Sequence, residues 1–258
     1  MAQEMTAVKE KTIAELAAES ASASQNTQKA VIEVNDVSKS FVVGKNVISV
    51  LKNINLKIYP EEFIIILGPS GSGKSTLLNI LLGLEAPTTG HVVLNGTDIT
   101  YMKTDKIAKI RYGVYGIIFQ RSDWIRSFSV LDNVTLPLAL NNIKKKIRRE
   151  QAWMRLKQVG MADHGLYYPT ELSGGQQQKV SLARSLINDP PIIVADEPTG
   201  NLDSVSAERV MNTFKDLNEK EHKTVMMVTH NIDYVRYASR TIYVRDGTII
   251  EGSEQFKK

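Results

Sequence analysis

The sequence predicts an α/β fold whose mixed central sheet carries an antiparallel β subdomain and an inserted helical subdomain. A five-residue apolar run, Phe63–Leu67, precedes a glycine-rich loop and a leucine-rich helical segment at 77–83. Two later apolar runs, 192–195 and 224–229, have the length and composition of buried strands. Between the loop and these runs, about 122–186 shows helical patterns without strand patterns, which predicts the helical subdomain.

Strand patterns around the glycine-rich loop favour the antiparallel subdomain. Val31–Val34, Val37–Phe41 and Val47–Ile58 alternate or are β-rich, with a break at Gly44. His91–Gly96 is a further strand that closes on an Asn-Gly turn.

Later segments supply the remaining strand and the helices. Asp105–Arg111 is helical in pattern, and Val114–Phe119 is a strand that ends at Gln120. Helical patterns then cover Asp132–Leu140 and Ile143–Val159. A basic cluster begins the second of them, and we interpret it as a solvated helix face: Lys144, Lys145, Lys146, Arg148 and Arg149.

The composition is that of a globular protein. The 258 residues include 42% hydrophobic and 23% charged residues, enough for an ample core. A net charge of +4 permits contact with an anionic membrane surface and does not argue for nucleic-acid binding. The chain has no cysteine, which excludes disulfides and fits a reducing compartment. Because neither a membrane span nor a secretory signal is evident, we expect a cytosolic chain unless a partner holds it at a membrane.

Residues 1–29 differ in composition from the remainder. Ala, Ser, Glu, Gln and Thr dominate, with a weak helical pattern at Met5–Glu19. Too little apolar surface is present to offset the entropy of ordering, so a disordered tail is favoured over a docking helix. The folded domain is therefore expected at 30–258.

The glycine-rich loop fits the phosphate-binding pattern G-x-x-x-x-G-K-[ST] in its required strand–loop–helix setting. Its residues are Gly68, Pro69, Ser70, Gly71, Ser72, Gly73, Lys74, Ser75 and Thr76. The glycines let backbone N–H groups surround an anion, and the helix start adds its positive dipole end. Lys74 can reach the β- and γ-phosphates, and the Ser75 hydroxyl can bind Mg²⁺. A glycine-rich turn with a stray lysine would not explain the flanking strand and helix, so we expect a nucleoside triphosphate here.

Two carboxylates follow the apolar run at 192–195. Asp196 and Glu197 would be costly at the end of a buried strand unless positive charge meets them, and Mg²⁺ held by Ser75 supplies it. Asp196 then fits as a metal partner and Glu197 as the residue that polarises an attacking water, the alternative being an ordinary acidic loop. His230 ends the next apolar run and can donate to the γ-phosphate or the water, although a lone histidine there is more often structural.

A second glycine motif, Leu172–Gln178, precedes a predicted helix at Lys179–Leu186. Its glycines let a backbone approach phosphate, Ser173 can cap the helix, and the helix start favours an anion. One γ-phosphate does not need two binding surfaces from a single molecule if they lie in separate lobes. The simplest interpretation is a head-to-tail pair in which each subunit completes the other's site.

With these motifs in this order, residues 31–253 resemble the ATPase subunits of ABC transporters, which implies a P-loop NTPase of ABC type that binds ATP and Mg²⁺. In that family, Gly68–Thr76 resembles Walker A and Leu172–Gln176 resembles the signature motif. The resemblance implies a set of catalytic residues: Glu197 as the catalytic glutamate, His230 as the switch histidine, Gln120 as the Q-loop glutamine, and Lys74. It also implies ligands of Mg²⁺: Ser75, Gln120 and Asp196 at the end of a Walker B-like strand.

Further nucleotide contacts are implied by the same resemblance. Phe41 falls where an aromatic residue stacks on adenine, a position that is often Tyr in the family. Asp203 lies in Asn201–Ser204, which is similar to a D-loop. The signature residues are expected to contact the nucleotide of a second subunit: Ser173, Gly174, Gly175 and Gln176.

A narrower resemblance connects Asp196–Ser204 and Asp132–Leu138 to the group of lipoprotein-release, macrolide-export and cell-division ABC ATPases. Members of that group usually drive membrane partners by mechanotransmission. Lys179 replaces a common arginine, which keeps the charge, and Arg121–Arg126 is an unusual continuation of the Q-loop. Within it, Trp124 is expected either to anchor a short cytoplasmic helix of the membrane subunit or to pack in the core of its own lobe.

The sequence thus predicts an ATP-hydrolysing motor subunit that pairs with a second ATPase subunit and drives integral membrane subunits from the cytoplasmic side of the membrane. One alternative is a soluble ABC-type ATPase that acts as a regulator or scaffold without transport. Another is a small-molecule kinase or GTPase, for which Ser173–Gln176 would have no purpose. No nucleic-acid partner is expected, because the long coiled-coil insertion of the DNA-repair members is absent.

Overall fold

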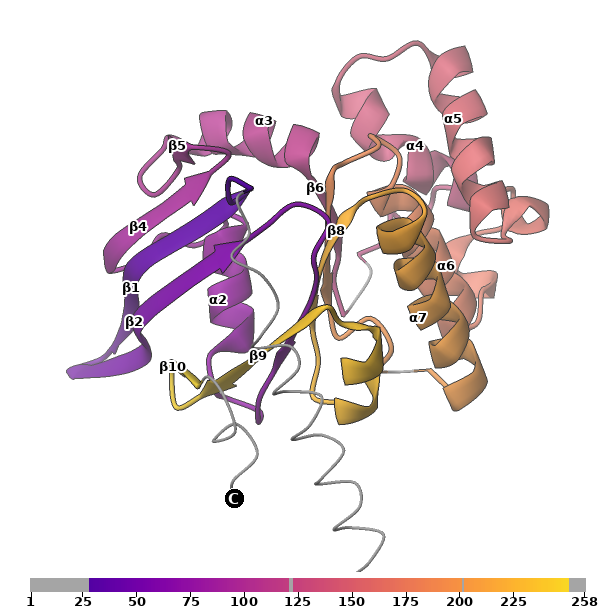
Figure 1. Cartoon of the computed structure of the whole chain (residues 1–258). Coiled ribbons are helices and arrows are strands. Elements are labelled where there is room, and N and C mark those ends of the chain that lie inside the picture. Colours follow the sequence, from indigo (N-terminus) through magenta and orange to yellow (C-terminus); the bar gives the residue numbers. More distant parts are fainter. Residues whose placement is uncertain (1–27, 121–122, 201, 251–258) are drawn as a thin grey trace, which may run out of the picture. The chain divides into compact units, whose positions relative to one another are not determined.

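The computed structural model of the chain describes residues 28–120, 123–200 and 202–250 (Figure 1). The predicted disordered tail lies almost entirely outside this range, as do Arg121, Ser122 and Asn201. The described chain forms two compact units: residues up to Tyr101 together with those from Val228 onward, and Met102–Met227. The predicted subdomain boundaries stay a prediction.

The first unit contains an antiparallel sheet with the strand order β2-β1-β4-β5. β1 (Ile32–Val43) pairs with β2 (Asn46–Ile58) in a long hairpin and with β4 (Thr89–Leu94) on its other edge. The Asn95-Gly96 turn joins β4 to β5 (Thr97–Asp98), and both turn residues have positive φ, 48° and 76°, as this type of turn requires. The predicted antiparallel subdomain is confirmed, and β1 joins two segments that the sequence suggested separately.

A second group of strands in the first unit has the order β10-β9-β3. β3 (Phe63–Leu67) is buried at all five positions and pairs in parallel with β9 (Arg240–Arg245). β9 also pairs antiparallel with β10 (Thr248–Ile250), so this sheet is mixed, as predicted. β3 leads through the glycine-rich loop into α2 (Lys74–Leu81).

The second unit has its own strands, in the order β8-β7-β6. β6 (Tyr115–Ile118) pairs in parallel with β7 (Ile192–Asp196), and β8 (Thr224–Val228) is buried throughout. α3 (Thr104–Val114) precedes β6 along the chain. Burial at nearly every position explains why β7 and β8 are apolar at consecutive positions.

The sequence patterns do not indicate α7 (Ser204–Glu219), which lies between β7 and β8 in the chain. Its buried apolar residues recur at helical spacing, and no more than two of them are adjacent, so they form no long apolar run in the sequence. They make one buried stripe on the helix: Ala207, Val210, Met211, Phe214 and Leu217.

Three helices of the second unit pack on one another: α4 (Val130–Leu140), α5 (Lys145–Gln158) and α6 (Gly174–Ser185) (Figure 1). In the described residues between β6 and β7 there is no strand, in agreement with the predicted helical subdomain. α6 begins at Gly174, five residues before the predicted start at Lys179, because Ser173 caps it there. Across the ranges that the structure describes, no helix has both the length and the apolar character that a membrane crossing requires.

Candidate nucleotide site

The glycine-rich loop begins directly after β3 at Gly68, a position with no room for a side chain. A Cβ atom added to Gly68 would lie 2.1 Å from the carbonyl oxygen of Val244 in β9. Gly73, the N-cap of α2, has φ 105°, and Gly71 has φ 78°, both in the region that favours glycine. The loop therefore wraps round the start of α2, where helix N–H groups attract an anion.

Lys74 lies inside this loop. Its side chain is only 8% exposed, and Nζ donates to the carbonyl oxygens of Gly68 and Pro69, each at 2.8 Å. Ser72 Oγ is buried and finds no hydrogen-bond partner within the described residues. An unsatisfied buried hydroxyl costs about 1–3 kcal/mol, and a phosphate oxygen would relieve that cost. The exposed Ser75 follows on the first turn of α2.

Two other predicted residues belong to the same unit as the loop. The Thr229 N–H donates to the carbonyl of Ile66 in β3 at 3.1 Å, so the exposed His230 comes next to the strand that leads into the loop. Phe41 is 37% exposed on β1, and the Lys39 ammonium lies 4.8 Å from its ring centroid. An exposed aromatic ring in this unit is suited to stack on a base.

In the second unit, Gln120 and Glu197 come together at one sheet edge. β6 and β7 are in register with Ile118 beside Ala195, so each of the two residues lies two positions beyond a paired strand residue. A Cβ atom added to Gly200 would lie 3.8 Å from Gln120 Nε2 and 3.9 Å from Glu197 Cβ. The side-chain amide of Gln120 and the side chain of Glu197 therefore both lie close to the turn at Gly200.

Glu197 has an unusual backbone conformation. Its φ of 46° is left-handed, and the turn is closed by the Gly200 N–H, which donates to the Glu197 carbonyl at 3.2 Å. Such a conformation costs a non-glycine residue about 1–3 kcal/mol and is concentrated at functional sites. Asp196, the last residue of β7, is half-buried directly before it.

The predicted D-loop and signature residues lie side by side in the same unit. Asp203 caps α7 by accepting a hydrogen bond from the Ser206 N–H at 2.9 Å, and hydrogen bonds from Ser206 lower the Asp203 pKa. A Cβ atom added to Gly175 in α6 would lie 3.4 Å from Ser206 Oγ. The starts of α6 and α7 are therefore neighbours.

The start of α6 is stabilised by a capping box. Ser173 Oγ accepts from the Gln176 N–H at 3.3 Å, and Gln176 Oε1 accepts from the Ser173 N–H at 2.8 Å. Because Gln176 Oε1 is an acceptor here, Nε2 donates to His164 Nε2 at 3.0 Å. Ser173 and Gly174 remain exposed at the helix start, where an anion would be favoured.

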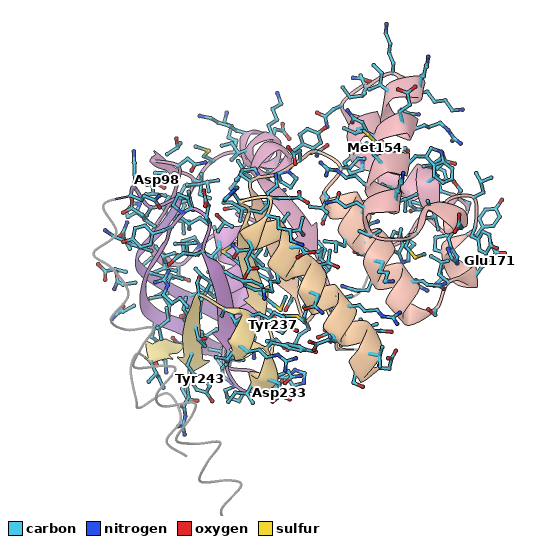
Figure 2. The ribbon with its side chains drawn as sticks, turned by 45° about the vertical axis from the view of Figure 1, so that its right-hand side comes forward. Asp98, Met154, Glu171, Asp233, Tyr237 and Tyr243 are labelled. Atoms are coloured by element: carbon cyan, nitrogen blue, oxygen red, sulfur yellow. The ribbon has the colours of Figure 1, made fainter. Side chains whose placement is uncertain are left out.

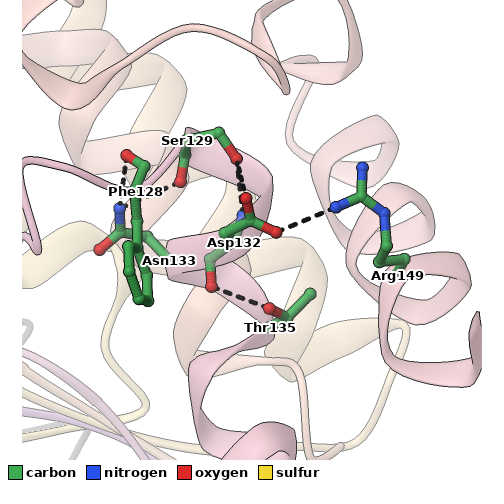
Figure 3. A network of polar contacts seen from close by, with 6 residues as sticks. All are labelled: Phe128, Ser129, Asp132, Asn133, Thr135 and Arg149. Carbon is green, nitrogen blue, oxygen red and sulfur yellow. Dashed lines mark hydrogen bonds and ion pairs between the residues drawn. The ribbon is translucent and has the colours of Figure 1, made fainter. Parts of the chain in front are cut away.

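Asn133 in α4 shapes the chain after Gln120, and sequence reasoning gave it no such role. It is fully buried, and its Nδ2 donates to the carbonyls of Ile125, Phe128 and Ser129 at 3.0, 3.2 and 3.0 Å. Its Oδ1 accepts from the Ile125 N–H at 3.0 Å. Figure 3 shows this asparagine beside the pair formed by Asp132 and Arg149, which are 3.0 Å apart. A single side-chain amide thus binds the backbone on both sides of the turn between Ile125 and Phe128 and at Ser129, the N-cap of α4.

These features define a P-loop nucleoside triphosphatase, since a glycine-bounded anion loop with a buried lysine occurs with a strand-end Asp-Glu pair. A family model described as ABC transporter matches residues 51–200. The chain belongs to that family and is an ATP-binding, ATP-hydrolysing subunit of the ABC type.

Similar proteins agree with this assignment. The uncharacterized ABC transporter ATP-binding protein YvrO of Bacillus subtilis (strain 168) is 44% identical over 220 residues, 85% of this chain and 96% of YvrO. The macrolide export ATP-binding/permease protein MacB of Syntrophobacter fumaroxidans is 40% identical over 221 residues, 85% of this chain and 31% of MacB. A solved dimer of the ATP-binding cassette MJ0796 of Methanocaldococcus jannaschii, in a post-hydrolysis state with ADP and Pi, has a TM-score of 0.80 at 41% identity, covering 84% and 96% of the two chains.

The comparisons confirm the predicted ABC-type fold, the ATPase class and the resemblance to macrolide-export ATPases. They exclude the small-molecule kinase and GTPase alternatives. The roles of individual site residues stay predictions.

Proposed function

We propose that this chain is the motor subunit of a membrane complex and works as a head-to-tail dimer at the cytoplasmic side of the membrane. The observation that carries the proposal is the exposed, capped start of α6 at Ser173 and Gly174, in a chain that already has a phosphate loop in its other unit. Two phosphate-binding elements in one chain are both used if each serves a different nucleotide. The dimeric structure of the MJ0796 cassette supports the pairing of two such chains.

In this proposal the first unit binds the triphosphate. The loop N–H groups and Lys74 hold the β- and γ-phosphates, Ser72 Oγ gains an acceptor, and Phe41 stacks on the adenine. Glu197 polarises the attacking water, and His230 and Gln120 orient the water and the γ-phosphate. Ser173–Gln176 of a second copy would then contact the same γ-phosphate.

Mg²⁺ fits this set of residues. It prefers one or two carboxylates together with phosphate oxygens and waters, and it needs no dedicated protein cage. Among the described residues, no cluster of three or more His, Cys, Asp or Glu could hold a metal ion by itself. Ser75, Asp196 and Gln120 would hold the ion, which when bound neutralises charge on the β- and γ-phosphate oxygens.

Glu197→Gln tests the catalytic role. The variant should bind ATP, because the phosphate loop is unchanged, and should hydrolyse it about 10²–10⁴-fold more slowly, because the water loses its base. It should accumulate as an ATP-bound dimer in gel filtration. Glu219→Gln, at the exposed end of α7, is the matched control and should be fully active. Near-normal turnover of Glu197→Gln would remove this residue from catalysis.

Lys74→Ala should impair an earlier step than Glu197→Gln does, namely the binding or positioning of ATP. It removes the cation that the loop carbonyls hold for the phosphates, so a fluorescent ATP analogue should bind more weakly or be positioned wrongly. Unchanged affinity together with unchanged turnover would contradict this role.

Crosslinking tests the head-to-tail dimer. The chain has no cysteine, so cysteines introduced at the exposed Ser70 and Gly174 form the only disulfide. In the Glu197→Gln background, ATP should produce a crosslink between two chains, seen as a dimer in non-reducing electrophoresis. A crosslink that forms only within one chain would refute the arrangement.

A groove in the second unit is suited to the membrane partner. It has a volume of about 590 Å³ and lies between the end of α3, the α4–α5 hairpin and the end of α6. Ile147 and Met154 on α5 line it and are 44% and 63% exposed, and Figure 2 labels Met154. Exposed apolar side chains at a groove indicate a protein interaction surface, and methionine adapts readily to a partner. We propose that a cytoplasmic segment of the membrane subunit binds here; MacB, an ATP-binding/permease protein, supports a membrane partner.

Met154→Asp should abolish association with the membrane subunit and leave ATP binding intact. Leu166→Asp is the matched control, because Leu166 is 67% exposed in the same unit and does not line the groove. Copurification with membranes measures the result. If both variants stay membrane-bound, the groove is not the docking site. If the unaltered chain never associates with membranes, the regulator or scaffold alternative is favoured.

A further inference from the structure

Two side chains of α6, the helix that begins in the signature motif, bind Trp124. The Trp124 indole Nε1–H donates to Gln177 Oε1 at 3.1 Å, and the Arg184 guanidinium lies 4.4 Å from the centre of the indole ring. Gln177 and Arg184 are seven positions apart on α6, about two turns, so they share one face of the helix. One aromatic side chain from the loop after Gln120 is therefore bound by α6.

Arg184 strengthens this attachment at the backbone. Its guanidinium donates to the Asp123 carbonyl at 2.9 Å, next to Trp124 in the chain. Asp123, Ile125 and Arg126 are exposed, whereas Trp124 is half-buried. Trp124 is thus a half-buried side chain in an otherwise exposed stretch, and α6 binds it.

Gln177 also binds the segment of chain that leads into the signature motif. Its Nε2 donates to the carbonyls of Pro169 and Leu172, both at 3.2 Å, and these carbonyls belong to the chain that enters Ser173. The Gln177 amide thus uses its acceptor for Trp124 and both donors for this entry segment. Rotation of the Gln177 side chain would release all three contacts together.

We propose that Trp124 is a positioning residue: it orients Gln177, and through Gln177 the entry to the signature motif, so that Ser173 is presented to the nucleotide of the opposing subunit. The proposal rests on the head-to-tail function described above. It also gives Trp124 a role within its own unit, in place of the predicted anchor for a membrane helix. Trp124 follows Gln120 by four residues in the chain. In this proposal, the loop that begins at the subunit's own nucleotide therefore contacts the helix whose signature motif binds the nucleotide of the opposing subunit.

The test uses Trp124→Phe in the full-length Glu197→Gln chain. Phenylalanine keeps a ring beside Arg184 and loses the N–H donor. Fluorescent-ATP affinity of the monomer should be unchanged, because the phosphate loop lies in the other unit. The ATP-dependent dimer should dissociate about fivefold more readily, the effect of one net hydrogen bond. Trp153→Phe, at the chain's other tryptophan, is the matched control and should dimerise normally.

A double-mutant cycle with Gln177→Leu shows whether Trp124 acts through Gln177. If it does, Trp124→Phe should weaken dimerisation in the Gln177 chain and have no further effect in the Gln177→Leu chain. Additive effects would overturn the proposal. So would a lowered melting temperature with unchanged dimerisation, since this would make Trp124 a core residue only.

The two proposals fail in different ways. If Glu197→Gln alone forms no ATP-dependent dimer, the head-to-tail function falls and the role of Trp124 falls with it. If Glu197→Gln dimerises and Trp124→Phe in that background dimerises equally well, only the role of Trp124 is refuted.

Discussion

Asn133→Asp is expected to destabilise the protein in a strongly pH-dependent manner. The asparagine is fully buried, and its amide donates to three carbonyls and accepts from one N–H. Aspartate has nearly the same shape and keeps the acceptor for the Ile125 N–H. It replaces the amide donors by an oxygen that faces the carbonyls of Ile125, Phe128 and Ser129.

The loss of folding stability depends on whether the introduced carboxyl is neutral or ionised. A neutral carboxyl keeps one donor and loses about one hydrogen bond, worth about 1 kcal/mol. An ionised carboxylate loses every donor and buries an uncompensated charge, which costs about 3 kcal/mol or more. Burial and the facing carbonyls raise the carboxyl pKa above its unfolded value of about 3.9. The loss of stability is therefore small below that pH and grows as the pH rises.

Thermal melting at pH 4 and pH 7 measures the effect. At pH 7 the melting temperature should fall by about 6–12 °C, from about 2–4 °C per kcal/mol for a domain of this size. Asn141→Asp is the matched control, since Asn141 lies exposed at the end of α4 and its side-chain amide donates to the Pro137 carbonyl at 3.1 Å. Equal shifts for the two variants at pH 7, or a shift at Asn133 that does not change with pH, would refute this reasoning.

Three other substitutions test separate features. Gly68→Ala should weaken nucleotide binding at least about tenfold, because the new methyl group would overlap the Val244 carbonyl; Gly113→Ala, in open space, should bind normally. Ser173→Ala should cost about 1 kcal/mol of stability at most, because its cap bond is long at 3.3 Å, whereas ATPase activity should fall much further; parallel losses would contradict a role in trans. Asp189→Asn should lower stability at pH 7 by less than about 1 kcal/mol, since Asp189 is 67% exposed. Hydrogen bonding with Lys223, assisted by Arg155, lowers the Asp189 pKa. The stability that Asp189 contributes is therefore present above about pH 4 and is lost as the pH falls through the lowered pKa. A stability difference between Asp189→Asn and the unaltered protein that persists at about pH 2 would contradict the ion pair.

The sequence predicts strands well where both faces are buried. Phe63–Leu67 and Ile192–Ala195 are apolar at every position because every one of these residues is buried, and the structure places strands there. The sequence predicts the start of α6 too late, at Lys179, because Gly174 and Gly175 are poor helix formers; in the structure the capping box outweighs that preference. The sequence does not reveal α7, because its buried stripe forms no continuous apolar run.

The motif residues could be predicted because phosphate and metal chemistry restricts their types and spacing. The supporting residues could not. Asn133 and Gln177 bind backbone carbonyls, and a carbonyl is present at every position, so the sequence does not mark the partner. The sequence predicts Trp124 as a membrane-helix anchor or a core residue, but its partner Gln177 lies 53 positions away and only the fold brings the two together.

The left-handed backbone at Glu197 has a consequence for the evolution of this chain. A glycine at this position would adopt φ 46° without strain, so Glu197→Gly should raise folding stability while removing the proposed catalytic carboxylate. Selection for a stable fold and selection for ATP turnover therefore act in opposite directions at this one residue. A duplicated copy released from hydrolysis should lose its glutamate early, and such a copy should be longer-lived in the cell than its active parent.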